Sequence, residues 1–115
     1  MRSPKDEIEG ELVKAITRGF NRSIILWLLS QGSRSGYTIV KEMRNLTGLS
    51  FQPGSIYPLL YDMEVRGFIA GQWVERGKRR MKYYSITEEG RRLLDRLKKL
   101  FRMPIGELLV DLIAE

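Results

Sequence analysis

The sequence contains neither cysteine nor histidine. The chain therefore forms no disulfide, has no thiolate nucleophile and lacks the Cys and His ligands of zinc sites. Ser–His and Cys–His catalytic pairs are excluded as well. No pair of carboxylates stands among apolar residues that could tune its pKa values, so we expect no catalytic residue, no metal and no cofactor.

Long hydrophobic runs are also absent. The longest run, residues 24–29, predicts a buried helical segment and is too short to cross a bilayer. The sequence shows no signal-peptide pattern, so we expect a cytoplasmic protein with no membrane partner. A length of 115 residues with 43% hydrophobic content predicts a single folded domain.

Negative charge is scarce relative to positive charge, with 14 Asp and Glu against 20 Lys and Arg. The excess gathers in residues 76–82, where the sequence RGKRRMK has five basic residues and no acidic one. Such a cluster suits a phosphate backbone. The alternative is a solvated hairpin whose charges only prevent edge-to-edge pairing.

Apolar spacing predicts two helices in the first third of the chain. Ser3 can cap the first helix, and Pro4 suits its first position. We expect Asn21 to cap a second, nearly all-apolar helix that ends near Gly32. This second helix is expected to be central, with Trp27 in the core.

A helix-turn-helix is predicted next. Ser35 can cap a third helix that ends near Gly48. Pro58 is tolerated only in the first turn of a helix, so the fourth helix is expected to begin at Gly54 or Ser55. The connection between them spans residues 47–53.

Two strand-like segments, residues 68–75 and 81–86, enclose the basic cluster and predict a hairpin. Thr87 can cap the helix that follows, and Pro104 is expected to kink or break it. The predicted fold is mainly α with a small β-hairpin: a winged helix-turn-helix with an extra N-terminal helix and a C-terminal dimerisation helix.

Three regions follow from this pattern: an N-terminal helix in residues 1–20, a winged helix-turn-helix in residues 21–87 and a dimerisation helix in residues 88–115. The apolar stripes of the first and last regions predict a homodimer. A membrane-surface helix at the C-terminus is disfavoured by Glu107 and Asp111. The expected interface residues are Ile8, Leu12, Ile16, Leu97, Phe101, Ile105, Leu108, Leu109 and Leu112.

Four segments carry a family resemblance: GYTI at residues 36–39, GSIYPLL at 54–60, EVRGFI at 64–69 and RMKYYSITEEG at 80–90. In order and spacing they resemble the signatures of PadR-family transcriptional regulators. The resemblance implies a winged-helix DNA-binding domain, a homodimer and regulation of transcription, commonly repression relieved by a small effector. The first 20 residues and the tail interrupted by Pro104 lie outside the signature.

DNA contacts are expected from the helix-turn-helix and the hairpin. For the helical residues, alternatives remain open: a cap for Ser35, a core ring for Tyr37 and packing against the hairpin for Tyr57. Side chains of these types bind phosphates or base edges. The candidates are Ser35, Tyr37, Lys41, Gln52, Ser55, Tyr57, Tyr61, Arg76, Lys78, Arg79, Arg80 and Lys82.

Trp73 is a candidate for stacking a small aromatic effector in a dimer pocket, although a strand tryptophan more often fills the core. Double-stranded DNA is the expected partner. Two other classes of function remain open, a winged-helix protein-interaction module and a small-molecule sensor, because a fold alone does not fix function.

Overall fold

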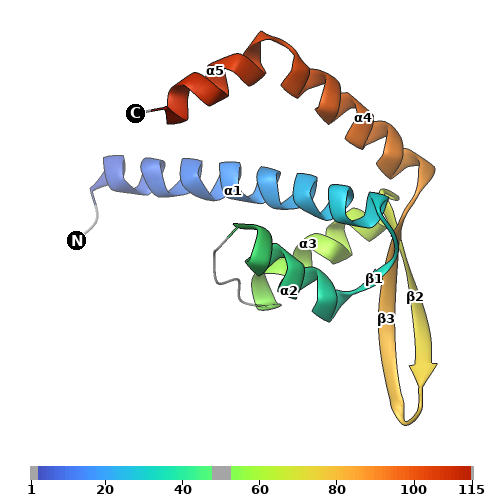
Figure 1. Ribbon diagram of the computed structural model, residues 1–115. Coiled ribbons are helices and arrows are strands. Elements are labelled where there is room, and N and C mark those ends of the chain that lie inside the picture. The colour runs from blue at the N-terminus through green and yellow to red at the C-terminus, as the bar shows by residue number, and fades with distance from the viewer. Residues whose placement is uncertain (1–2, 48–52, 115) are drawn as a thin grey trace.

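The structure is a computed structural model that describes residues 3–47 and 53–114 (Figure 1). Three helices and a small sheet form the body of the molecule, and two further helices extend from it. The elements are α1 (Pro4–Ser30), β1 (Arg34–Ser35), α2 (Gly36–Thr47), α3 (Pro53–Val65), β2 (Ile69–Arg76), β3 (Arg79–Ile86), α4 (Glu88–Arg102) and α5 (Pro104–Ile113). In the described part of the chain, no helix is long and apolar enough to cross a membrane.

The N-terminal helix is one continuous helix of 27 residues, so the prediction of two helices was wrong. Its start is as predicted. Ser3 and Asp6 form a capping box, in which the Ser3 hydroxyl accepts from the Asp6 amide at 3.3 Å. Asn21 is buried inside the helix and caps nothing. No proline stands at the expected junction, and packing of the following apolar turns continues the helix across it.

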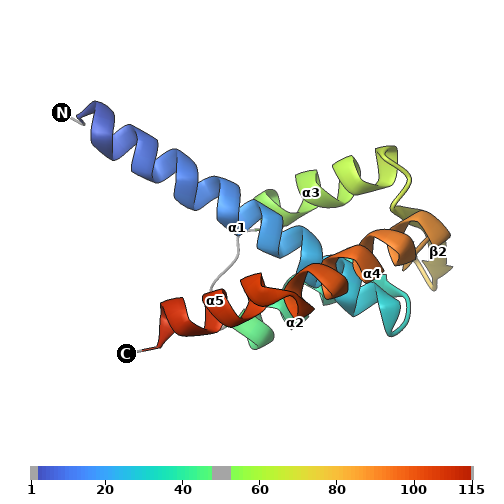
Figure 2. The same ribbon diagram turned by 90° about the horizontal axis from the view of Figure 1, so that it is seen from above.

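Only the C-terminal half of α1 belongs to the core. Ile25 and Leu26 are fully buried there, whereas Ile8 and Leu12 are 65% and 59% exposed in the N-terminal half. In Figures 1 and 2 this N-terminal half extends past α2 and α3 as a separate arm. The core that α1 shares with α2, α3 and the sheet consists mainly of Ile25, Leu26, Leu29, Ile39, Met43, Ile56, Leu60, Met63 and Ile69.

Trp27 is not in this core, contrary to the prediction. It is 41% exposed and lines a hollow between α1 and α4, beside Leu97 and Phe101. The apolar pattern around residues 24–29 is nearly continuous, so the pattern could not distinguish the side of α1 that faces α2 and α3 from the side that faces α4.

The sheet has three antiparallel strands in the order β1-β3-β2. The hairpin of β2 and β3 is paired up to Arg76 and Arg79, so the basic tip is part of the strands. Gly77 turns the chain there with a φ of 61°. The two-residue β1 pairs with Tyr83 and Tyr84 of β3, and the sequence pattern did not predict it.

The C-terminal helices begin as predicted. The Thr87 hydroxyl accepts from the Gly90 amide at 3.1 Å, and Pro104 opens a separate helix, α5. Figure 1 shows α4 leaving the body and the chain changing direction between α4 and α5. The second arm of the molecule is therefore formed by α4 and α5.

Gly90→Ala is expected to lower the free energy of unfolding by about 1–3 kcal/mol, because an added Cβ would overpack a filled site. That Cβ would collide with the Phe68 carbonyl oxygen and lie 2.7 Å from Cγ1 of Ile86. Thermal unfolding should show a Tm lower by roughly 5–15 °C. Gly10→Ala is the control, since its Cβ would meet nothing within 4 Å and alanine favours a helix. Equal Tm values for the two variants would contradict the packing of α4 on the hairpin.

Candidate nucleic-acid interface

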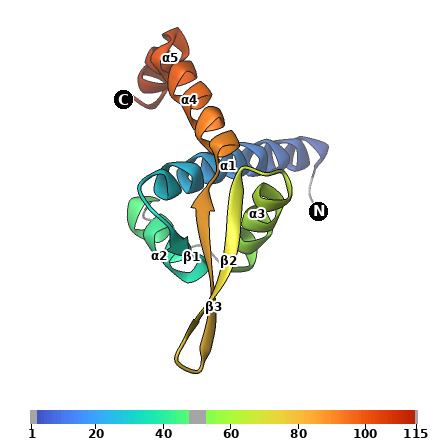
Figure 3. The same cartoon turned by 90° about the vertical axis from the view of Figure 1, so that its right-hand side faces the viewer.

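One end of the molecule combines the start of α2, the start of α3 and the hairpin. Figure 3 shows the hairpin projecting beyond both helices, away from α4 and α5. The candidate nucleic-acid residues in the described part of the chain come from these three elements and from Ser35, the last residue of β1, which directly precedes α2. Gln52, the remaining candidate, lies outside the described residues.

The hairpin presents its cations on two faces. Arg80 and Lys82 are two positions apart in β3, so their side chains lie on the same face of the hairpin. Trp73 lies on that face too, since it pairs directly with Lys82. Arg76 and Arg79 pair with one another on the opposite face, and Lys78 lies in the exposed turn. The five predicted basic residues are therefore brought together at one tip but point in different directions.

Aromatic rings hold several of these cations. The Arg80 guanidinium lies 4.9 Å from the centre of the Trp73 ring, and the Arg76 guanidinium lies 5.4 Å from that of Tyr83. The Lys82 ammonium lies 5.3 Å from the ring of Tyr84. Such cation–π contacts orient flexible side chains while leaving their charge available.

Lys82 also reaches back to α3. Its ammonium group donates a hydrogen bond to Oε1 of Glu64 at 2.7 Å. This hydrogen bond raises the pKa of Lys82, although partial burial opposes the shift. Lys82 therefore stays charged throughout the physiological range, with part of its charge balanced by Glu64. The sequence pattern gave no signal for this pair, because the residues are 18 positions apart.

The first turns of α3 place polar groups at the surface and apolar groups underneath. Ser55 is exposed, Tyr57 is 42% exposed and Tyr61 is 70% exposed, whereas Ile56 and Leu60 are fully buried. Ser55, Tyr57 and Tyr61 therefore lie on the exposed side of α3, opposite its apolar residues.

Pro58 lies inside α3 and not in its first turn, because the helix begins at Pro53 and not at Gly54 or Ser55 as expected. A proline at this position leaves the carbonyl of residue 54 without its helical donor. Gly54 is exposed, so water can satisfy that carbonyl, and the earlier start is tolerated.

At the start of α2, the candidates differ in availability. Ser35 is buried, and its hydroxyl accepts from the Thr38 amide at 3.2 Å, so it caps the helix as expected. Tyr37 is 69% exposed, which excludes the alternative of a core ring. Lys41 is exposed on the next turn.

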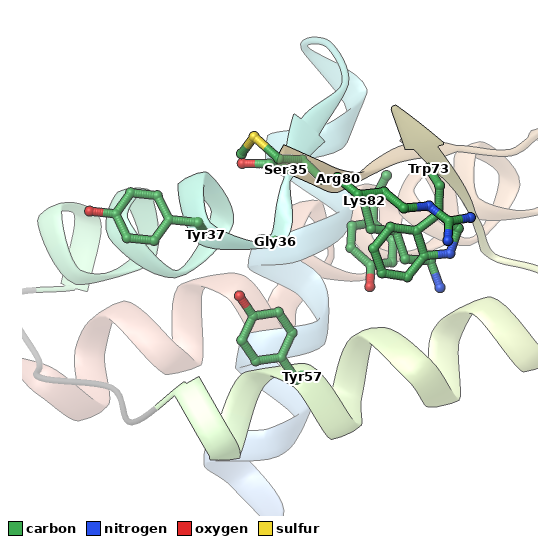
Figure 4. Close-up of a pocket in the computed structure, with 9 residues that line it drawn as sticks. Ser35, Gly36, Tyr37, Tyr57, Trp73, Arg80 and Lys82 are labelled. Carbon is green, nitrogen blue, oxygen red and sulfur yellow. The ribbon is translucent and has the colours of Figure 1, made fainter. Parts of the chain in front are cut away.

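A cleft of about 410 Å³ separates α3 from the hairpin (Figure 4). Tyr57 lies on the α3 side, with its ring packed so closely on Gly36 that a Cβ there would lie 2.6 Å from Cε1 of the ring. Arg80 and Trp73 lie stacked on the hairpin side. Tyr84 lines the cleft too, and burial raises its pKa, so its hydroxyl remains a neutral donor. The cleft therefore combines cations, hydroxyls and aromatic rings.

The predicted dimer residues lie on the other side of the molecule, in the two arms. Within one chain the structure does not bring Ile8, Leu12 and Ile16 of α1 together with the residues of α4 and α5. Leu97 and Leu109 are partly buried, and the others are exposed to between 41% and 73%: Ile8, Leu12, Ile16, Phe101, Ile105, Leu108 and Leu112.

An apolar hollow of about 380 Å³ lies between α1 and α4. Its wall includes Leu97 and Phe101, which the sequence had indicated, and Trp27 and Leu46, which it had not. The sequence did not indicate a place for Trp27 in this hollow, because its helical segment is apolar on nearly all sides and was expected to be buried.

A helix-turn-helix followed by a basic antiparallel hairpin defines the molecule as a winged helix-turn-helix protein. Comparison with known proteins narrows this class. The model of the PadR-like family of transcriptional regulators matches residues 25–96, which is more than half of the chain. The protein therefore belongs to the PadR-like family and is a transcriptional regulator, not an enzyme.

The proteins to which the chain is similar include two PadR proteins of known structure. An uncharacterized protein of Lysinibacillus sphaericus is 38% identical over 89 residues, which cover 73% of this chain and 80% of the relative. A PadR family regulator from Eggerthella lenta superposes with a TM-score of 0.73 at 26% identity, covering 96% and 97% of the two chains. Bacillus subtilis PadR in complex with operator DNA superposes with a TM-score of 0.61 at 30% identity, covering 66% of this chain and 45% of that chain.

Proposed function

We propose that this regulator binds double-stranded DNA sequence-specifically, as a homodimer on a pseudo-palindromic operator. The observation that carries the proposal is the convergence of the polar start of α3 and the basic hairpin on one end of the molecule. The similarity to a PadR protein in complex with operator DNA supports it. A protein-interaction module would not need five basic residues on this hairpin.

In the proposed complex, α3 enters the major groove and the hairpin lies along the neighbouring backbone and minor groove. Ser55 and Tyr57 lie at the exposed start of α3 and Tyr61 one turn further along its exposed side, where side chains reach base edges and phosphates. Phosphate contacts beside α2 are assigned to Tyr37 and Lys41, which are both exposed. The hairpin contacts are assigned to Arg76, Lys78, Arg79, Arg80 and Lys82.

The homodimer is proposed from the two exposed arms. The first turns of α1 are acidic, with Asp6, Glu7, Glu9 and Glu11 against Lys5. The last turns of α4 are basic, with Lys98, Lys99 and Arg102, and Lys98 lines the apolar hollow. We assign the N-terminal half of α1 from one subunit to the hollow of its partner, where apolar stripe and charge are both complementary. Residues 1–20 and 88–115 would then be the dimer contacts, and residues 21–87 the DNA-binding domain.

Repression is the proposed mode of regulation, because a dimer that occupies an operator excludes other proteins from it. A small aromatic effector of this repressor would not meet Trp73 in the dimer interface. Trp73 lines the cleft between α3 and the hairpin, away from the hollow between α1 and α4. A ligand stacked on Trp73 would compete with DNA directly.

The test is a binding selection from random duplexes with the full chain. We expect a pseudo-palindrome whose half-sites are centred about 34–36 Å apart, or a multiple of that, because two-fold symmetric helices enter successive major grooves. Recovery of sequences without symmetry would overturn the dimeric arrangement. Failure to enrich any sequence would overturn specific recognition.

A further inference from the structure

Trp73 is a large aromatic residue that lies outside the core. It is 54% exposed on a projecting hairpin; its direct cross-strand partner is Lys82, and Arg80 lies two positions before Lys82 on the same face of β3. The Arg80 guanidinium lies 4.9 Å from the ring centre and the Lys82 ammonium 5.8 Å. The ring therefore lies outside the core and in contact with the charged groups of the hairpin.

This arrangement is fixed to α3 through Glu64. The Lys82 ammonium is held 2.7 Å from Oε1 of Glu64, and both side chains pass over Gly71. A Cβ at Gly71 would collide with Cε of Lys82 and lie 2.8 Å from Oε2 of Glu64. The absence of a side chain at Gly71 thus leaves the space in which α3 and the hairpin are joined.

The proposed complex also defines where the cleft between α3 and the hairpin lies on a duplex. With α3 in a major groove and the hairpin at the adjacent minor groove, the strand that separates the two grooves runs between them. That strand presents sugars and phosphates to the cleft. Arg80 lies on the hairpin side of the cleft, opposite Tyr57.

We propose that Trp73 is a positioning residue for DNA binding, which holds Arg80 on the wall of this cleft for the phosphates of the strand between the grooves. The inference rests on the proposed function. A free arginine loses rotamer freedom when it binds, and a stacked arginine has already lost part of it. The stack therefore increases affinity without Trp73 reading any base.

The first test is a double-mutant cycle on a random-sequence duplex. Trp73→Leu should weaken binding about three- to tenfold, in the range of cation–π contacts. Arg80→Ala should weaken binding in the parent chain but much less in the Trp73→Leu chain, because both changes remove the same positioned charge. Arg79 is the matched control: it is the adjacent basic residue on the opposite face, so its alanine variant should be additive with Trp73→Leu.

The second test is rescue together with fluorescence. Trp73→Phe keeps an aromatic face and should restore most of the affinity that Trp73→Leu loses. In a Trp27→Phe chain, Trp73 is the only tryptophan, and its emission should change when the duplex is added. A Trp73 with a purely structural role would show neither the coupling to Arg80 nor this change.

The inference is overturned if the Trp73→Leu chain binds as tightly as the parent chain or if the effects of Arg80→Ala and Trp73→Leu on affinity are additive. It is also overturned if the emission of Trp73 does not change when the duplex is added. These results differ from failure of the proposed function, in which the parent chain itself would not bind the duplex at low salt.

Discussion

Replacing both Arg79 and Arg80 by alanine is expected to weaken binding to every duplex, the selected operator and a scrambled one alike, by on the order of tenfold to a hundredfold near physiological salt. The two guanidinium groups lie at the tip of the hairpin on opposite faces, so they can contact phosphates on both sides of it. Neither forms an ion pair among the described residues, so their charge is available to DNA.

The salt dependence of DNA binding tests the role of the two arginines more sharply than the loss of affinity does. Each phosphate contact on duplex DNA contributes about −0.9 to the slope of the logarithm of the binding constant against the logarithm of the salt concentration. Removing two contacts should therefore make the slope less negative by about 1.8. The measurement is a fluorescence-anisotropy titration at several salt concentrations.

The control for this variant is Arg91→Ala combined with Arg92→Ala. Both residues are exposed at the start of α4, away from the tip of the hairpin. The control changes the net charge by the same amount and should leave the slope nearly unchanged. An equal loss in both variants would show a general charge effect and would refute a specific role for the hairpin.

Introducing aspartate at both Leu12 and Ile16 is expected to convert the dimer to a monomer and to weaken operator binding about a hundredfold or more. Both side chains are more than half exposed in the single chain, so the monomer should tolerate the change. In the proposed dimer they enter an apolar hollow, where two unpaired carboxylates are costly. Affinity falls because two linked half-site contacts become independent.

Sedimentation equilibrium measures the mass, and circular dichroism establishes that the variant is folded. The matched control is Arg18→Asp, which also changes the net charge by two but lies on another face of α1. The control should remain dimeric. A Leu12→Asp/Ile16→Asp chain that is still a dimer would exclude α1 from the interface.

The features that the sequence predicted are those set by local interactions. Ser3, Thr87 and Pro104 act within one or two turns of a helix, and all three were placed correctly. The hairpin followed from two strand-like segments that enclose a basic cluster, and its strands begin and end within two residues of the prediction. The exposed start of α3 followed from the spacing of its apolar residues.

The features that the sequence did not predict depend on contacts between distant segments. The two-residue β1 exists only because Tyr83 and Tyr84 pair with it. Glu64 joins Lys82 across the turn between α3 and β2, and no local pattern marks such a pair. Trp27 was expected in the core, and the core was the more frequent alternative for Trp73. Each is at least 41% exposed, because hydrophobicity alone does not say which side of an element is covered.

The most direct test of DNA binding by this surface is a salt titration of the parent chain on the selected duplex and on a scrambled duplex of the same length. The proposed function predicts a steep salt slope on both, from phosphate contacts, and much tighter binding to the selected duplex, from contacts of α3 with base edges. Equal affinities would contradict sequence-specific recognition, and a flat slope would contradict the assignment of the basic hairpin to the DNA backbone.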